Sequence, residues 1–185
     1  MSGEMDTARH QDDSERQRAF RDAMGLFPTG VTLVTARGAD GVDHAITANS
    51  FTSVSLDPLL VLVCVEHASR LHDVVLAAGR WGVSVLSLDA EPLSRKLARR
   101  GHDTAGALAG VAHHRGPYTG ALLLDRALAT FECATVAAHP GGDHTVLLGE
   151  VLAVDMPHPE EPPLAYHRGR YTAVAGPDGV TDLTG

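Results

Sequence analysis

The sequence predicts a single, mainly β domain with short helices, an α+β fold in which an antiparallel sheet closes into a barrel. Three observations predict this fold. Several β-branched or apolar runs alternate with turn residues, only three segments between them carry helical signals, and no internal repeat or interdomain linker interrupts the 185 residues. Strands joined by tight turns favour antiparallel pairing and a closed sheet over alternating βαβ units.

The N-terminal part of the chain predicts an amphipathic helix. Ser14 and Gln17 can form a capping box, so the helix is expected to begin near Glu15. Its apolar face carries Phe20, Met24 and Phe27. We expect residues 1–13 to be a disordered tail, residues 14–175 to form the domain, and residues 176–185 to be a C-terminal tail.

The first half of the domain predicts strands with one short helix between them. The run 31–35 is β-branched except for one leucine, and Asp40-Gly41 supplies a hairpin turn. The continuously apolar run 60–65 predicts a strand buried on both faces. A helix capped by Ser69 and stopped by Gly79 then leads to a strand over 81–88.

The second half predicts one more helix and a long hairpin. The helix is expected over 91–100, with Asp89 as its cap, Pro92 in its first turn and Gly101 at its end. Strands over 127–137 and 145–154 flank a turn at 139–144. The result is a β-hairpin with a polar, histidine-bearing tip.

Charge and cysteine usage exclude several classes of function. Lys and Arg (15) against Asp and Glu (23) give a net charge of −8 without a long basic tract, so we expect no nucleic acid partner. The N-terminus lacks a signal-peptide layout and the longest aliphatic run is too short to span a bilayer, so we expect a cytoplasmic protein that is not in a membrane. Taken alone, Cys64 and Cys133 predict core packing.

Metal and nucleotide motifs are missing from the sequence. There is no HExxH or CxxC, and neither His113-His114 nor the pair His139 and His144 has a third ligand at a useful spacing, so we expect no metal site. There is also no GxGxxG and no P-loop. A nicotinamide, if one is used, has to bind without a domain of its own.

The densest polar cluster is the candidate ligand loop. Hydroxyl and amide side chains fill six of the nine positions from Thr47 to Ser55. Such groups are costly to bury without partners, and a flat heteroaromatic ligand with donors and acceptors along its edge satisfies them. An ordinary solvated loop is the alternative interpretation.

Three further features have a functional and an ordinary interpretation. Ser69-Arg70, at the start of a predicted helix, suits a phosphate, or is only a cap. His144 follows Asp143, which can orient its imidazole for proton transfer or for binding a carboxamide, or it is an incidental loop histidine. The third feature is the basic helix face of Arg95, Lys96, Arg99 and Arg100, a weaker phosphate candidate or a solvated surface.

Several dispersed motifs, in order along the chain, carry a family resemblance. They are Phe27-Pro28-Thr29-Gly30-Val31, the run from Thr47 to Pro58, Glu132-Cys133, Gly142-Asp143-His144 and Gly169-Arg170-Tyr171. Together they resemble the flavin reductase family of FMN-binding split barrels, the short-chain reductase components of two-component flavin-dependent monooxygenases. The resemblance departs from the family at Leu97, where many relatives have an aromatic residue, and over 102–114, which is Ala- and Gly-rich.

The resemblance implies a role for each motif. The loop from Thr47 wraps the flavin ring and ribityl chain, the segment 66–70 holds the phosphate, and His144 borders the nicotinamide together with the segment 169–171. His144 is the candidate catalytic residue. The implied cofactor-binding residues are Thr29, Thr47, Ala48, Asn49, Ser50, Ser53, Val54, Ser55, Cys64, Ser69, Arg70, His144, Arg170 and Tyr171.

The activity implied by the resemblance is that of an NAD(P)H:flavin oxidoreductase. NADH or NADPH would reduce FMN, with FAD as the alternative, and the reduced flavin would pass to a partner monooxygenase; relatives are homodimers. Two alternatives remain open at this point. One is a split-barrel oxidase that holds flavin tightly and oxidises a small substrate, and the other is a non-catalytic flavin- or haem-binding barrel.

Overall fold

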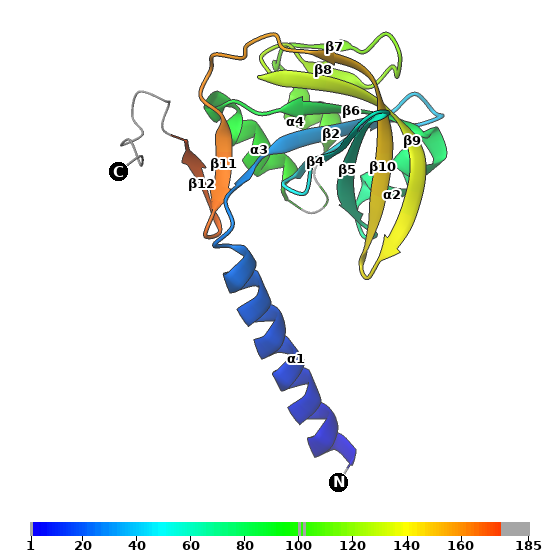
Figure 1. The fold of residues 1–185 in the computed structure, drawn as a ribbon. Coiled ribbons are helices and arrows are strands. Elements are labelled where there is room, and N and C mark those ends of the chain that lie inside the picture. The colour runs from blue at the N-terminus through cyan, green and yellow to red at the C-terminus, as the bar shows by residue number, and fades with distance from the viewer. Residues whose placement is uncertain (1, 100, 102, 175–185) are drawn as a thin grey trace.

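The computed structural model describes residues 2–99, 101 and 103–174. Strands dominate the described chain and helices connect them (Figure 1). The helices are α1 (Ser2–Met24), α2 (Arg70–Ala78), α3 (Glu91–Leu97) and α4 (Thr104–Leu108), with a 3-10 turn η1 (Leu88–Ala90) before α3.

The main sheet is antiparallel throughout and has the order β3-β2-β6-β9-β10-β5-β4. Its strands are β2 (Thr32–Arg37), β3 (Asp43–Ala48), β4 (Thr52–Leu56), β5 (Leu59–Glu66), β6 (Arg80–Val85), β9 (Ala129–Gly141) and β10 (His144–Asp155). The predicted fold class, mainly β with short helices, is confirmed.

The two edge strands of this sheet bring about its closure. β3 lies at one edge and β4 at the other, yet only residues 49–51 connect them. A connector of this length spans little more than 10 Å, so the sheet has to curl until its edges meet. Because β3 and β4 pair with other strands and not with each other, the barrel stays split along this seam.

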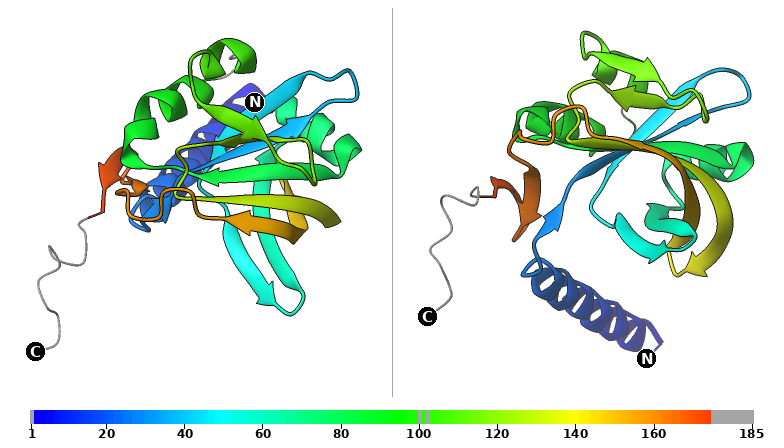
Figure 2. Two further views of the ribbon diagram at one scale, coloured as in Figure 1. Left: turned by 90° about the horizontal axis from the view of Figure 1, so that it is seen from above. Right: turned by 45° about the horizontal axis from the view of Figure 1, so that its top comes forward.

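Two smaller sheets complete the fold. One pairs β7 (His113–Arg115) with β8 (Leu122–Leu124), and the other has the order β1-β11-β12, with β1 (Thr29–Gly30), β11 (Leu164–His167) and β12 (Arg170–Ala173). α1 extends away from the barrel (Figure 1 and the right view of Figure 2).

The barrel interior is an apolar core centred on Trp81. This side chain is fully buried, and its indole nitrogen donates to Thr135 Oγ1 over 3.1 Å. Gly149 lies beside the indole ring, where a Cβ atom would collide with it. α2 contributes Leu71 and Val75 to the same core, so this helix is held firmly against the barrel.

Most predicted elements are confirmed, including the hairpin turn at Asp40-Gly41 and the helix between Ser69 and Gly79. Ser69 caps α2 by accepting a hydrogen bond from Leu71 N, and Gly79 ends the helix in the left-handed conformation, with φ of 61°. The strand predicted over 81–88 runs from Arg80 to Val85. The predicted hairpin is β9–β10, whose strands extend further than expected and leave only Gly142-Asp143 as the turn.

Several expectations need correction. The first helix begins at Ser2 and not near Glu15, so it includes the segment expected to be a tail; that segment contains no proline and no glycine after residue 3 to stop it. Asp89 does not cap α3: it lies in η1, within 3.8 Å of Arg126, and Ala90 is the N-cap.

The strand over 60–65 is buried on one face only. Its side chains alternate between buried and half-buried, and the second face lines the cavity described below at Cys64. The stretch 101–120, for which the sequence predicts no helix or strand, contains α4 and β7. The helix predicted over 91–100 ends earlier, at Leu97, with Ala98 as its C-cap. Arg100 and the tail 176–185 lie outside the described residues.

Candidate active site

A cavity of about 1030 Å³ lies against the barrel seam. Its walls come from β3 and the connector that follows it, the end of β5, the start of α2, the segment between α3 and β7, and the first residue of β10. This volume is at the upper end of the range for small-molecule sites, roughly 300–1,000 Å³, so the cavity has room for two aromatic ligands.

The first half of the predicted ligand loop lines this cavity. Thr47, Ala48, Asn49 and Ser50 all contribute to its wall. The Ser50 hydroxyl accepts a hydrogen bond from Cys64 N over 3.0 Å and lies 3.2 Å from Cys64 O, so the connector is tied to β5. The other half of the loop forms β4, and Ser53, Val54 and Ser55 do not line the cavity.

The strand β5 leads from the barrel core into this wall. Val61, Val63 and Val65 are buried in the core, whereas Cys64 and Glu66 line the cavity on the alternate face. Both cysteines were expected to pack in the core. Only Cys133 does so, and it is fully buried. Cys64 is half-buried and lines the cavity.

The start of α2 forms the wall beyond β5. Ser69 and Arg70 both line the cavity. Ser69 is also the N-cap of α2, so the two interpretations of this pair are compatible. A helix N-terminus and an arginine side chain provide donors and positive potential, which suit an anionic group.

His144 faces the cavity from the β9–β10 turn. It pairs in register with Glu66 of β5, and directly opposed residues in an antiparallel pair share one face of the sheet. Its Nδ1 donates to Asp143 Oδ1 over 2.7 Å. The hydrogen bond from His144, followed by the attraction of its imidazole, lowers the pKa of Asp143. Since a carboxylate only accepts, Asp143 fixes the proton on Nδ1 and directs Nε2 away from itself.

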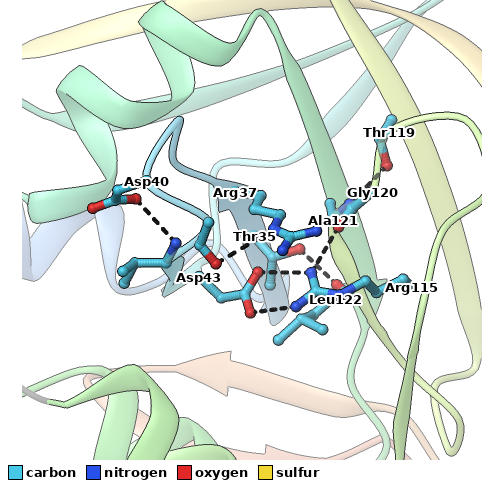
Figure 3. Close-up of polar contacts among 11 residues, drawn as sticks. Thr35, Arg37, Asp40, Asp43, Arg115, Thr119, Gly120, Ala121 and Leu122 are labelled. Atoms are coloured by element: carbon cyan, nitrogen blue, oxygen red, sulfur yellow. Dashed lines mark hydrogen bonds and ion pairs between the residues drawn. The ribbon is translucent and has the colours of Figure 1, made fainter.

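The opposite end of the cavity is fixed by an ion pair (Figure 3). Arg115 donates from both terminal nitrogens to the two carboxylate oxygens of Asp43, over 2.9 and 2.8 Å, and one of them also donates to Gly120 O. The hydrogen bond to Asp43 is the main cause that raises the pKa of Arg115. Asp43 lines the cavity, so this contact holds the β2–β3 hairpin against β7 at the rim.

Three predicted residues lie in the small sheet of β1, β11 and β12 and do not line the cavity: Thr29, Arg170 and Tyr171. Tyr171 packs on α3, where Ser94 Oγ donates to its hydroxyl over 2.8 Å and the Arg95 guanidinium lies 4.9 Å from its ring centre. Thr29 Oγ1 is buried without a hydrogen-bond partner among the described residues.

The basic residues predicted to form one helix face lie in different surroundings. Arg95 bonds Glu91 over 2.7 Å and covers Tyr171, whereas Arg99 lines the cavity. Lys96 is exposed and does not line it. Arg100 lies outside the described residues. Only one member of the predicted face is therefore placed at the cavity.

Sequence reasoning missed several polar residues of the site. Asp43, His44 and His113 line the cavity, and His113 Nδ1 lies 2.7 Å from Val111 O. No motif marks these residues, because they meet only when the sheet closes. Among residues 2–99, 101 and 103–174, no cluster of three or more His, Cys, Asp or Glu residues is arranged to hold a metal ion. Nor does any helix in those ranges have the length and apolar character needed to cross a bilayer.

Comparisons with known proteins converge on one family. The model of the flavin reductase like domain family matches residues 24–175. The chain is 40% identical over 166 residues to the actinorhodin polyketide dimerase of Streptomyces coelicolor, with 89% of this chain and 90% of the relative covered. It is 38% identical to the NADH-dependent FMN reductase AsuE2 of Streptomyces nodosus subsp. asukaensis, with 85% of each covered.

Two further matches are a reductase subunit of a monooxygenase and a solved structure. The chain is 34% identical to the reductase subunit HsaB of a flavin-dependent monooxygenase of Mycobacterium tuberculosis, with 85% of this chain and 82% of the relative covered. The structure of the Streptomyces globisporus NADH:FAD oxidoreductase SgcE6 in complex with NAD and FAD fragments superposes with a TM-score of 0.81 at 37% identity, and the match covers 90% and 96% of the two chains.

Proposed function

Because this chain belongs to the family of flavin reductase like domains, we propose that it transfers a hydride from NADH to FMN or FAD within the cavity described above. The observation that carries this proposal is that one cavity collects the polar connector after β3, the start of α2 and His144. A single site then serves donor and acceptor, which agrees with the lack of a Rossmann motif.

The residues present fit a flavin. The polar wall of Thr47, Asn49 and Ser50 offers donors and acceptors to the edge of a heteroaromatic ring, and Ser69-Arg70 offers cationic and backbone donors to a phosphate. When bound, the flavin supplies the electrophilic ring that accepts the hydride. The protein binds the ring through the connector and holds the anionic tail at α2.

His144 acts on the nicotinamide side in this proposal. Asp143 holds its ring through Nδ1, so neutral His144 offers Nε2 to the cavity as an acceptor, and protonated His144 offers it as a donor. Either form can bind a carboxamide, which has both a carbonyl oxygen and an amide group. His144 is thus proposed to orient the hydride donor rather than to act as a nucleophile.

We further propose a monooxygenase partner, a cytoplasmic location and a homodimeric state for this protein. A relative that is the reductase subunit of a flavin-dependent monooxygenase supports delivery of reduced flavin to such an enzyme. We propose the cytoplasm as the compartment, since it supplies NADH. We also propose a homodimer, supported by exposed apolar residues near the end of α1 and just after it, Phe20 at 68% and Phe27 at 66% exposure.

Anaerobic stopped-flow absorbance tests the activity directly. Protein and FMN are mixed with NADH, and in separate runs with NADPH or with FAD, against protein-free controls. Rapid bleaching of the oxidised-flavin band is expected with NADH. Flavin that binds but is not bleached by either nicotinamide would reject the proposal. Flavin that remains bound through purification in that case would favour an oxidase or a flavin-binding protein.

A further inference from the structure

A network of hydrogen bonds centred on Thr145 lies next to His144, on the other face of β10. Thr145 Oγ1 is 2.8 Å from His72 Nε2 and 3.2 Å from His67 Nε2, and His72 Nδ1 is 2.8 Å from Asp73 Oδ1. The two imidazole rings meet edge to face with centroids 4.9 Å apart. We call His67, His72, Asp73 and Thr145 the threonine network.

The donors and acceptors of the threonine network have one consistent order when both imidazoles are neutral. Asp73 only accepts, so His72 carries its proton on Nδ1 and presents Nε2 as an acceptor. The Thr145 hydroxyl then donates to His72, and its oxygen accepts from His67 Nε2. A hydroxyl is required at this position, because it has to donate and accept at once.

The threonine network connects a fixed element to an exposed turn. His72 belongs to α2, which is anchored in the barrel core by Leu71 and Val75. Thr145 directly follows His144, and the turn before it is held by a second contact, in which His67 N donates to Asp143 O over 3.0 Å. Thr145 is only 8% exposed, so water competes little for its hydrogen bonds.

We propose that Thr145 is a positioning residue for the reaction: through the threonine network it holds the turn that carries His144 at a fixed place relative to α2. This inference rests on the proposed function, because the network acts from the other face of β10 on His144, which is proposed to contact the nicotinamide. The wall that holds the flavin, made of the connector 49–51 and the start of α2, is fixed by other contacts. Loss of the network should therefore affect NADH and spare the flavin.

The test compares Thr145→Val with Thr145→Ser. Valine keeps the shape of threonine and removes the hydroxyl, whereas serine keeps the hydroxyl. In Thr145→Val we expect kcat/KM for NADH to fall about five- to tenfold through a higher KM, as for the loss of one to two hydrogen bonds. The flavin Kd should stay within about twofold, and Thr145→Ser should recover most of kcat/KM. A folded Thr145→Val variant with wild-type kcat/KM for NADH would overturn the inference.

Two further variants separate positioning from general damage to the fold. Thr130→Val removes another buried hydroxyl, 3% exposed on β9 and outside the cavity lining, and should leave the KM for NADH unchanged. His67→Ala removes the exposed donor of the network and is expected to raise the KM for NADH by itself. Combined with Thr145→Val, it should add little, because both variants remove the same contact.

These variants also distinguish failure of the inference from failure of the proposed function. If the wild-type protein does not bleach flavin with NADH, the proposed function fails. If the wild-type protein bleaches flavin while His67→Ala and Thr145→Val match it in KM, only the role of the threonine network fails. If Thr145→Val does not fold, an unchanged KM for NADH in His67→Ala overturns the inference.

Discussion

His144 is the single side chain on which the proposed chemistry depends most. Replacing it by alanine removes the Nε2 group at the cavity while the barrel core stays intact. We expect His144→Ala to lower kcat/KM for NADH by about tenfold or more and to leave the flavin Kd within about twofold, since only the nicotinamide loses a partner. Stopped-flow reduction and fluorescence titration of the flavin measure the two quantities.

His139→Ala is the matched control for this experiment. His139 is exposed on the β9 side of the same hairpin and does not line the cavity. Its replacement should leave both quantities unchanged. Wild-type kinetics in His144→Ala would remove His144 from the site, and equal losses in both variants would point to damage of the hairpin.

Cys133 makes the stability of the fold sensitive to alkaline pH. Burial, with a smaller contribution from the charge of Glu132, raises the pKa of this thiol from 9.0 to about 12. The unfolded chain loses the thiol proton first, so the stabilisation is full below pH 9 and decreases as pH rises toward 12. At pH 10 this single group is expected to lower the free energy of unfolding by about 1 kcal/mol.

Urea denaturation at pH 8 and pH 10 measures this effect when wild type and Cys133→Ala are compared. All other groups are the same in the two proteins, so the difference between their pH profiles is the relevant quantity. The alanine variant should show a smaller loss of stability between the two pH values. Parallel pH profiles for the two proteins would contradict the assignment of the shift to Cys133.

At the level of elements, β9 organises the loop 116–120 through one buried carboxylate. Glu132 is 3% exposed, and its Oε2 accepts from Tyr118 N, Thr119 N and Thr119 Oγ1 over 2.7–2.9 Å. Gly116 leaves the room for this carboxylate, since a Cβ atom there would collide with it. The Glu132-Cys133 motif therefore has a structural role that the sequence does not reveal.

Replacing Glu132 by alanine leaves these donors without a partner. We expect Glu132→Ala to lower the free energy of unfolding by about 3 kcal/mol, because three hydrogen bonds to a buried charge are lost. The urea midpoint measures the loss. Glu150→Ala, at an exposed position on β10 of the same sheet, is the control and should change stability by less than about 0.5 kcal/mol. A loss of similar size in both variants would contradict this role.

At the scale of the whole molecule, the described apolar side chains of α1 are not covered by the barrel. It extends away from the barrel (Figure 1), and apolar side chains in its last turns are exposed, Phe20 at 68% and Met24 at 52%. An isolated helix gains little stability without packing of its apolar face. A second copy of the chain would bury this face.

Light scattering after size-exclusion chromatography tests the dimer. The wild-type chain should elute with twice the monomer mass, and Phe20→Glu combined with Phe27→Glu should shift it to the monomer, because four charges would enter the two symmetric patches. Gln17→Glu adds charge to an exposed position of α1 without removing an apolar group and should stay dimeric. A monomeric wild type would refute the proposed dimer.

The sequence predicted those parts of the molecule that depend on local signals. The cap at Ser69, the stop at Gly79 and the β9–β10 hairpin follow from nearby residues, and they place Ser69, Arg70 and His144 at the cavity. Local patterns predicted the wrong burial for β5, because alternation between buried and half-buried positions is hidden when both faces carry apolar residues. They also missed the Asp43–Arg115 pair, whose members are 72 residues apart.

The unbroken register between the end of β5 and the start of β10 limits how this chain can diverge. His144 opposes Glu66 and Thr145 opposes Val65, so neighbouring residues serve opposite faces of the sheet. One residue inserted within the first positions of β10 would exchange the two faces and put the histidine toward the core. Two inserted residues would restore the parity. In sequences that descend from this one, insertions or deletions in the first positions of β10 should therefore involve an even number of residues, even where the residues themselves differ.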